Sequence, residues 1–187
     1  MHQVQLEIRK IANPLKIPIY QNFFKTGKGQ YAEGEIFLGA SVPHLRIIAK
    51  KNLKISLDDI LILLQSPVYE DRLTALLILV YKYQFSENDE ESKKIVLFYL
   101  ENHHYGNNWG LIDGIADKIL GPWLIDRDKK ILYEFALSDN LWEKRIAVIT
   151  TLHFIKHKMY DDTIKISEIL LLDTHDLIHK AVGWMLR

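Results

Sequence analysis

Two tryptophans, an aspartate and an arginine stand at spacings that place charge beside aromatic rings. Trp109 and Asp113 are one helical turn apart, so a helix would carry an indole and a carboxylate on the same flank. Arg145 falls on an otherwise apolar arc, where a guanidinium needs an anion from the protein or from outside. Trp184 follows Lys180 by one turn and again sets an indole beside a charge. Together these residues predict a lined groove, although buried tryptophans and an internal Asp113–Arg145 ion pair remain the alternative.

The elements that must position these residues are helices. Apolar residues recur at spacings of three and four, and no segment alternates convincingly as a strand would. The joints are short and carry Ser, Asn, Asp, Gly and Pro, which favours antiparallel neighbouring helices. The predicted helices cover residues 43–51, 56–65, 69–83, 91–102, 108–120, 129–136, 141–157, 160–172 and 176–186.

An internal repeat relates the two halves of the chain. Residues 70–75 align with residues 143–148, and Arg72, Trp109, Arg145 and Lys180 follow one another at intervals of 37, 36 and 35 residues. That interval is the length of a two-helix unit, and stacked units form an α-solenoid whose inner helices line a concave surface. We therefore predict an all-α, HEAT-like superhelix forming a single domain over 1–187, with a coincidental register of amphipathic helices as the alternative.

Composition limits the classes of function. The 187 residues include 24 basic and 24 acidic side chains, so any polyanion must be bound by a local patch. Residues 1–57 provide such a patch, with nine basic residues against three acidic ones, although a solvated face would look the same. The absence of cysteine excludes disulfides, thiolate metal sites and a cysteine nucleophile. We expect a cytoplasmic protein, without a signal peptide or membrane span.

Several segments resemble the DNA alkylation repair family of HEAT-like-repeat DNA glycosylases, the AlkD type. The resemblance covers nearly the whole chain and keeps the order and spacing of the family's motifs. Two departures are Gly110, where many members have an acidic residue, and the end at Arg187, where similar proteins continue and an apolar face would be left uncapped. The matching segments are FKTGKGQYAEGE (24–35), FLG (37–39), VPHLR (42–46), SPVYEDR (66–72), NNW (107–109), LID (111–113), NLWEKRIA (140–147) and DLIHKAVGWMLR (176–187).

The resemblance implies a function and a set of site residues. It implies that Asp113 is the catalytic carboxylate, that Trp109 and Trp184 line the lesion site, and that the groove holds duplex DNA containing alkylated purines. We also expect a monomer that is associated with the nucleoid when bound to DNA. Residues expected at the DNA backbone are Arg145, Lys25, Lys28, Arg46, Lys51, Arg72 and Lys180.

The implied chemistry needs few groups. Alkylation at N3 or N7 makes a purine cationic and a good leaving group, so one carboxylate can stabilise the sugar cation and align water. A DNA-binding protein of the same family without catalysis, or a protein-binding scaffold, are the alternatives. We expect no cofactor and no metal, because the paired histidines at 153/157 and 175/179 lack the glutamate of a metalloprotease helix.

Overall fold

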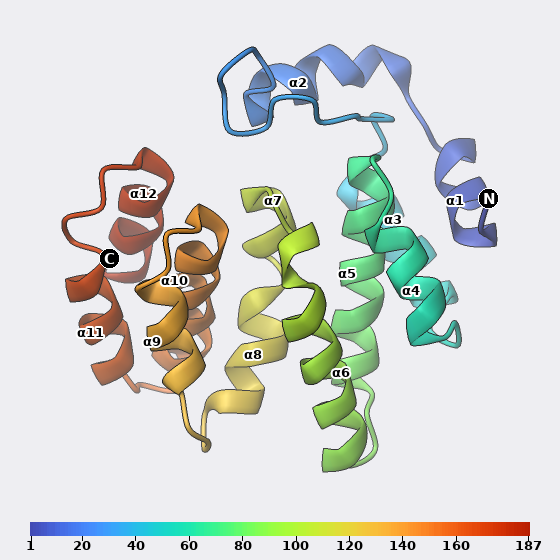
Figure 1. Cartoon of the computed structure of the whole chain (residues 1–187). Coiled ribbons are helices and arrows are strands. Elements are labelled where there is room, and N and C mark those ends of the chain that lie inside the picture. The colour runs from blue at the N-terminus through green and yellow to red at the C-terminus, as the bar shows by residue number, and fades with distance from the viewer. The chain divides into compact units, whose positions relative to one another are not determined.

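The computed structural model describes residues 1–187 and contains helices but no sheet (Figure 1). The predicted all-α class is confirmed. One isolated bridge joins Ile36 to Val68. The elements are α1 (Gln3–Lys10), the 3-10 turn η1 (Pro14–Lys16), α2 (Ile17–Phe24), α3 (Val42–Lys51), α4 (Leu57–Leu64), α5 (Tyr69–Gln84), α6 (Asp89–Asn102), the 3-10 turn η2 (His103–Tyr105), α7 (Trp109–Ile112), α8 (Ala116–Leu124), α9 (Lys130–Ala136), α10 (Leu141–Lys156), α11 (Asp161–Ile169) and α12 (Asp176–Met185).

The chain divides into two compact units, Met1–Asn108 and Trp109–Arg187. The single domain over 1–187 and the HEAT-like repeat stay predictions.

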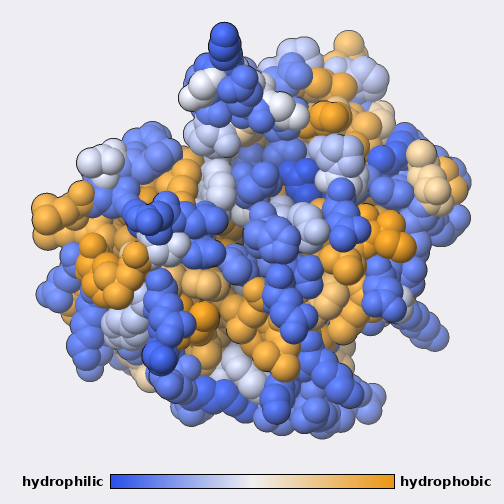
Figure 2. All heavy atoms as spheres, viewed as in Figure 1, coloured by the Kyte–Doolittle hydropathy of each residue, from blue (hydrophilic) through white to orange (hydrophobic).

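None of the helices is both long enough and apolar enough to span a bilayer. The face in Figure 2 mixes hydrophilic and apolar areas, and one of the apolar areas lies over the α11 and α12 end. Exposed apolar side chains of those two helices, the segment between them and the residue that follows α12 are Ile164, Ile169, Leu171, Leu172, Trp184 and Leu186.

Helix α5 is the centre of the first unit. Every residue from Tyr69 to Val80 is buried, including charged residues that must therefore be paired. Asp71 accepts two hydrogen bonds from Arg9 of α1, at 2.5 and 2.8 Å. Glu70 accepts N–H groups from residues 38–40. Helices α1, α3, α4 and α6 pack on α5, so α5 fixes both the helices and the segment before α3.

The first 24 residues contain helices that the sequence analysis did not predict. These are α1, η1 and α2, each too short to show several turns of apolar period. Helix α1 begins with a capping box in which the His2 side chain accepts the N–H of Val4 and the Gln5 side chain accepts the N–H of His2. Histidine is an uncommon N-cap residue, so this start signal was not recognised.

Helix α10 is the centre of the second unit. It begins after Asn140, whose side chain accepts the N–H of Trp142, and buries Arg145 to Thr151 without a break. Helices α7, α8, α9, α11 and α12 all pack on α10. The second unit is therefore built around one buried helix, as the first unit is.

The prediction of one continuous helix over 108–120 is wrong. This segment is split into α7 and α8 by a turn over residues 113–115, where Ile115 has φ −124° and ψ −55°, outside helical geometry. The predicted joint at Gly121 and Pro122 instead lies inside α8. The break brings Asp113 to the end of a helix rather than its middle.

Candidate functional site

The turn between α7 and α8 holds Asp113. Its backbone N–H donates to the Trp109 carbonyl at 3.0 Å, which closes the last turn of α7. Leu111 and Ile112 on one side and Ile115 on the other are about 1% exposed. These buried neighbours fix the backbone of the turn, while the Asp113 side chain keeps 19% of its surface exposed. A rigid carboxylate that still reaches solvent is the result.

Arg145 of α10 binds the carboxylate of Asp113 with two parallel hydrogen bonds. Nε lies 2.7 Å from Oδ1, and Nη2 lies 2.6 Å from Oδ2. Its third nitrogen, Nη1, donates to the Leu177 carbonyl of α12 at 2.5 Å. Fork geometry of this kind fixes the plane of a carboxylate as well as its position. The internal ion pair that the sequence left open is thus present.

The start of α12 is fixed by two consecutive residues of α10. Lys144 donates to Asp173 at 2.7 Å, and Arg145 reaches the Leu177 carbonyl. Burial would raise the pKa of Asp173, but hydrogen bonds from Lys144 and from the His175 N–H hold that pKa below its usual value. Trp184 is two turns further along α12, so α10 positions its helix.

The two tryptophans differ in exposure. Trp184 is 42% exposed, and Trp109 is half-buried. Neither is enclosed in the core. Lys180, one turn before Trp184, is exposed and pairs with Asp176 at 2.7 Å, which lowers the pKa of that carboxyl group. The second unit therefore carries Trp109, Asp113, Arg145, Lys180 and Trp184, while a groove shared by the tryptophans and the carboxylate stays a prediction.

The remaining predicted residues lie in the first unit. Lys25 and Lys28 are exposed in the segment that follows α2, with Lys25 in the left-handed conformation at φ 57°. Arg46 and Lys51 are exposed on α3. All four side chains can meet a polyanion. Arg72 differs from them because only 7% of the residue is exposed.

Arg72 and Arg145 occupy similar environments. Arg72 donates to Glu35 at 2.6 Å and to the Ser66 carbonyl at 3.0 Å, as Arg145 does to Asp113 and to Leu177. Both arginines are buried, although the Nε of Arg72 has no acceptor, so little of either surface is left for the phosphate contacts predicted for them. The sequence analysis did not identify Glu35 as the partner of Arg72. The only indication in the sequence is that Glu35 is an acidic residue within the basic first third of the chain.

The histidine pairs do not converge with acidic residues on a common centre. His175 caps α12 by accepting the Leu177 N–H, and His179 contacts the Asp173 carbonyl. The rings of His153 and His157 lie 4.5 Å apart. No group of three or more histidine, aspartate or glutamate side chains is arranged to hold a metal ion.

The arrangement around Asp113 can stabilise a cation. A carboxylate held by a buried arginine cannot rotate away, and an exposed indole in the same unit can contact a positively charged ring. In comparisons with known proteins, the family model described as DNA alkylation repair enzyme matches residues 4–187. No curated protein matches the chain.

Proposed function

Since the chain belongs to the DNA alkylation repair enzyme family, we propose that it is an AlkD-type DNA glycosylase that releases N3- or N7-alkylated purines from duplex DNA. Asp113 is the catalytic carboxylate of this proposal. The observation that carries it is the placement of Asp113, held at both oxygens by Arg145 yet partly exposed to solvent. Family membership makes DNA the partner and repair of alkylation damage the role.

The reaction asks little more of the protein than one oriented carboxylate. The bond between C1′ and the purine nitrogen breaks, and its electron pair leaves with the base, which becomes neutral. Water adds to C1′ and gives up a proton to the surrounding solvent. The negative charge of Asp113 stabilises the cationic sugar in between and aligns the water. Arg145 acts through Asp113 as a positioning residue, because each of its three nitrogens already donates to an acceptor within the protein.

The two tryptophans supply selectivity. Each well-placed contact between an indole face and a cation contributes roughly 0.5–2 kcal/mol. A neutral, undamaged purine gains neither this contact nor the advantage of a good leaving group. The exposure of Trp184 supports this role, since an indole must reach the surface of the protein to meet a base in DNA.

The exposed basic residues hold the DNA backbone. Lys25, Lys28, Arg46 and Lys51 of the first unit and Lys180 of the second are exposed and can each release a counterion on binding. This interaction with the phosphates does not depend on the DNA sequence, and repair of lesions at scattered positions requires such independence. A catalytically inactive DNA-binding protein would use the same residues and differ only in the chemistry at Asp113.

Release of free base from alkylated duplex DNA by wild type and Asp113→Asn tests the proposal. The amide removes the charge that stabilises the sugar cation, so the rate should fall about a hundredfold or more. Asp139→Asn is the matched control, because Asp139 is an exposed carboxylate of the same unit without a partner. Base release by Asp113→Asn at the wild-type rate would exclude Asp113, and no release by wild type that binds DNA would favour the inactive alternative.

A second variant separates catalysis from folding. Asp113→Asn leaves the buried Arg145 without its counter-ion, which can cost about 3–5 kcal/mol of stability. Asp113→Glu keeps the charge of the pair and moves the carboxylate by about one carbon–carbon bond. It should unfold near the wild-type temperature and release base much more slowly. Full activity of a folded Asp113→Glu would argue against a positioned carboxylate.

A further inference from the structure

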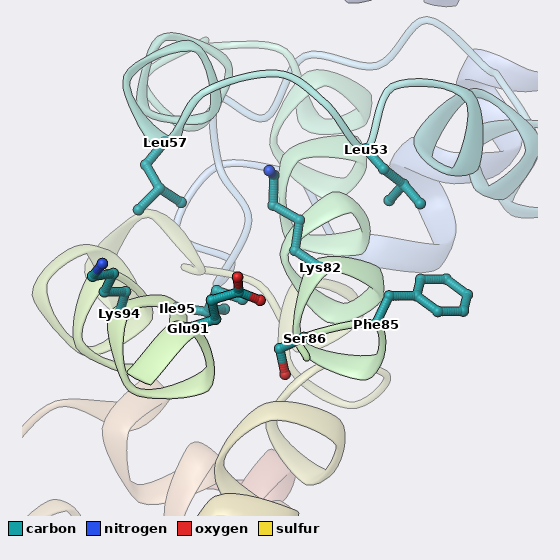
Figure 3. A pocket seen from close by; sticks show the side chains of 8 residues that line it. All are labelled: Leu53, Leu57, Lys82, Phe85, Ser86, Glu91, Lys94 and Ile95. Carbon is teal, nitrogen blue, oxygen red and sulfur yellow. The ribbon is translucent and has the colours of Figure 1, made fainter. Parts of the chain in front are cut away.

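A cavity of about 370 Å³ opens between α4, α5 and α6 in the first unit (Figure 3). This volume lies at the lower end of the range for small-molecule sites. None of its residues belongs to the site around Asp113 or to the exposed basic set. The lining residues are Leu53, Leu57, Lys82, Phe85, Ser86, Glu91, Lys94 and Ile95.

Lys82 is the half-buried one of the two lysines that line the cavity. Figure 3 shows the Lys82 side chain extending from α5, with its Nζ between Leu53 and Leu57. It has no hydrogen-bond or ion-pair partner within the protein, and burial lowers its pKa. A half-buried ammonium beside leucine side chains gives up part of its hydration without compensation. An anion bound in the cavity would compensate the ammonium for this lost hydration.

The other polar groups of the cavity are not equivalent to Lys82. The Glu91 carboxylate accepts the Glu87 N–H at 3.0 Å. The Ser86 hydroxyl lies 2.7 Å from the Tyr83 carbonyl and 2.6 Å from the Ser92 hydroxyl. The Ser86 hydroxyl is already paired within the protein. The cavity therefore carries two lysine side chains, Lys82 and the exposed Lys94, against the single carboxylate of Glu91, and this excess of basic groups favours an anion.

We propose that this cavity binds a small amphipathic carboxylate, with its carboxylate at Lys82 and its apolar body against Leu53, Leu57 and Ile95. The apolar lining selects a hydrocarbon or ring, and the unpaired amine selects the charge. A free inorganic anion would leave the leucines exposed to water, and a neutral apolar molecule would leave Lys82 unpaired. The cavity is small enough to favour a body of medium-chain length. This site is separate from the proposed glycosylase chemistry and stands if that proposal fails.

Calorimetric titration of the full chain with octanoate, octan-1-ol and octylammonium tests both parts of the recognition. Octanoate should bind saturably. The alcohol and the ammonium should bind at least about tenfold more weakly, because the alcohol offers Lys82 only an uncharged acceptor and the ammonium repels it. Lys82→Met keeps the length and apolar stem of the side chain and should weaken octanoate about tenfold. Lys93→Met is the matched control on α6, since Lys93 is exposed and outside the cavity, and it should bind octanoate as wild type does.

A second measurement uses the wild-type protein alone, so it does not depend on the folding of a variant. Octanoate should protect Lys82 from an amine-acylating reagent, as read by mass spectrometry of its peptide, and leave Lys93 as reactive as before. Equal affinity for octanoate and octan-1-ol, undiminished binding to folded Lys82→Met, absence of octanoate binding, or unchanged acylation of Lys82 would each overturn the proposal.

Discussion

Arg145 holds both carboxylate oxygens of Asp113, with Nε 2.7 Å from one and Nη2 2.6 Å from the other. The arginine side chain is 6% exposed and that of the aspartate is 19% exposed. The pair is therefore buried from the arginine side and open from the carboxylate side. The attraction within such a pair is largely offset by the free energy of removing the two charges from water. Its clearest effect is therefore to fix where the carboxylate lies.

Arg145→Lys tests this positioning role. Lysine keeps the charge, but its ammonium cannot hold two oxygens and the Leu177 carbonyl in one plane. Single-turnover base release with saturating enzyme should fall about tenfold or more, which is the effect of losing ~1.4 kcal/mol of orientation. The affinity for DNA should stay close to wild type, because the side chain is buried. Both quantities are measured on the same alkylated duplex.

The control for this substitution is Arg127→Lys. Arg127 belongs to the same unit and stacks on Trp123 at 3.9 Å, outside the Asp113 turn. It should release base as wild type does. If Arg145→Lys instead loses DNA affinity and keeps its single-turnover rate, Arg145 acts at the DNA backbone, as the sequence analysis expected.

The sequence allowed the main helices to be predicted better than the ends and partners that make the site. Helix α10 begins after an Asn140 cap and continues for sixteen residues without glycine or proline, so its position follows from local pattern. The break after Asp113 depends on one residue, Ile115, leaving helical geometry, and no turn residue other than Gly114 marks it. Local sequence patterns therefore predict α10 correctly, but they do not predict the turn over residues 113–115.

The partners of the two buried arginines depend on packing between segments far apart in sequence. Asp113 precedes Arg145 by 32 residues, and the spacing alone could not decide between an internal anion and a ligand. Glu35 precedes Arg72 by 37 residues and lies in a segment without helical period. Arg145 was expected at the DNA backbone from the family resemblance, and Arg72 occupies the equivalent position two repeat intervals earlier. Neither argument could reveal their acidic partners.

Trp184→Ala should reduce base release only in part. The substitution removes one indole contact of roughly 0.5–2 kcal/mol and leaves Asp113 and Arg145 in place, so the rate should fall by about two- to thirtyfold. Trp184 is 42% exposed, and the fold should survive its truncation. Rates on N7-methylguanine and N3-methyladenine DNA measure the effect. Loss as complete as that of Asp113→Asn would show that the indole does more than contact the lesion.

Charge reversal at Lys25, Lys28 and Lys51 should weaken binding to any duplex. These exposed side chains lie in the basic first third, and each phosphate contact contributes about 0.9 to the slope of log affinity against log salt. The triple glutamate variant should therefore show a shallower slope by up to about three. Lys93→Glu with Lys165→Glu, both exposed outside that segment, should leave the slope unchanged. If the affinity for duplex DNA changes neither with salt nor with these substitutions, the result would favour a protein scaffold.

His153 should make the protein less stable in mild acid. Burial lowers the pKa of His153, and the charges of His157 and Lys156 add to this, against the opposing Asp117. The unfolded chain then binds a proton more readily than the folded one. The contribution to stability is full above the unfolded pKa of about 6.5 and is lost as the pH falls through the folded pKa.

The urea midpoint at pH 7.5 and at pH 5.0 measures this effect. His153→Gln should show a smaller decrease between the two pH values than wild type. His104→Gln is the control, because His104 is exposed and should keep the wild-type decrease. An equal decrease in all three proteins would assign the acid sensitivity to other groups.

Gly121 makes the contact between α8 and α10 possible. A Cβ added at Gly121 would lie 2.3 Å from the Cβ of His153, and neither atom can rotate away because both are attached directly to the backbone. Gly121→Ala must therefore move the two helices apart, which typically costs about 1–3 kcal/mol and exceeds the gain of roughly 1 kcal/mol in helix propensity. Gly183→Ala on α12 meets nothing within 4 Å and should stabilise the protein slightly. Denaturant unfolding of the two alanine variants compares them directly, and a Gly121→Ala protein as stable as Gly183→Ala would show that α8 and α10 are not held in this close contact.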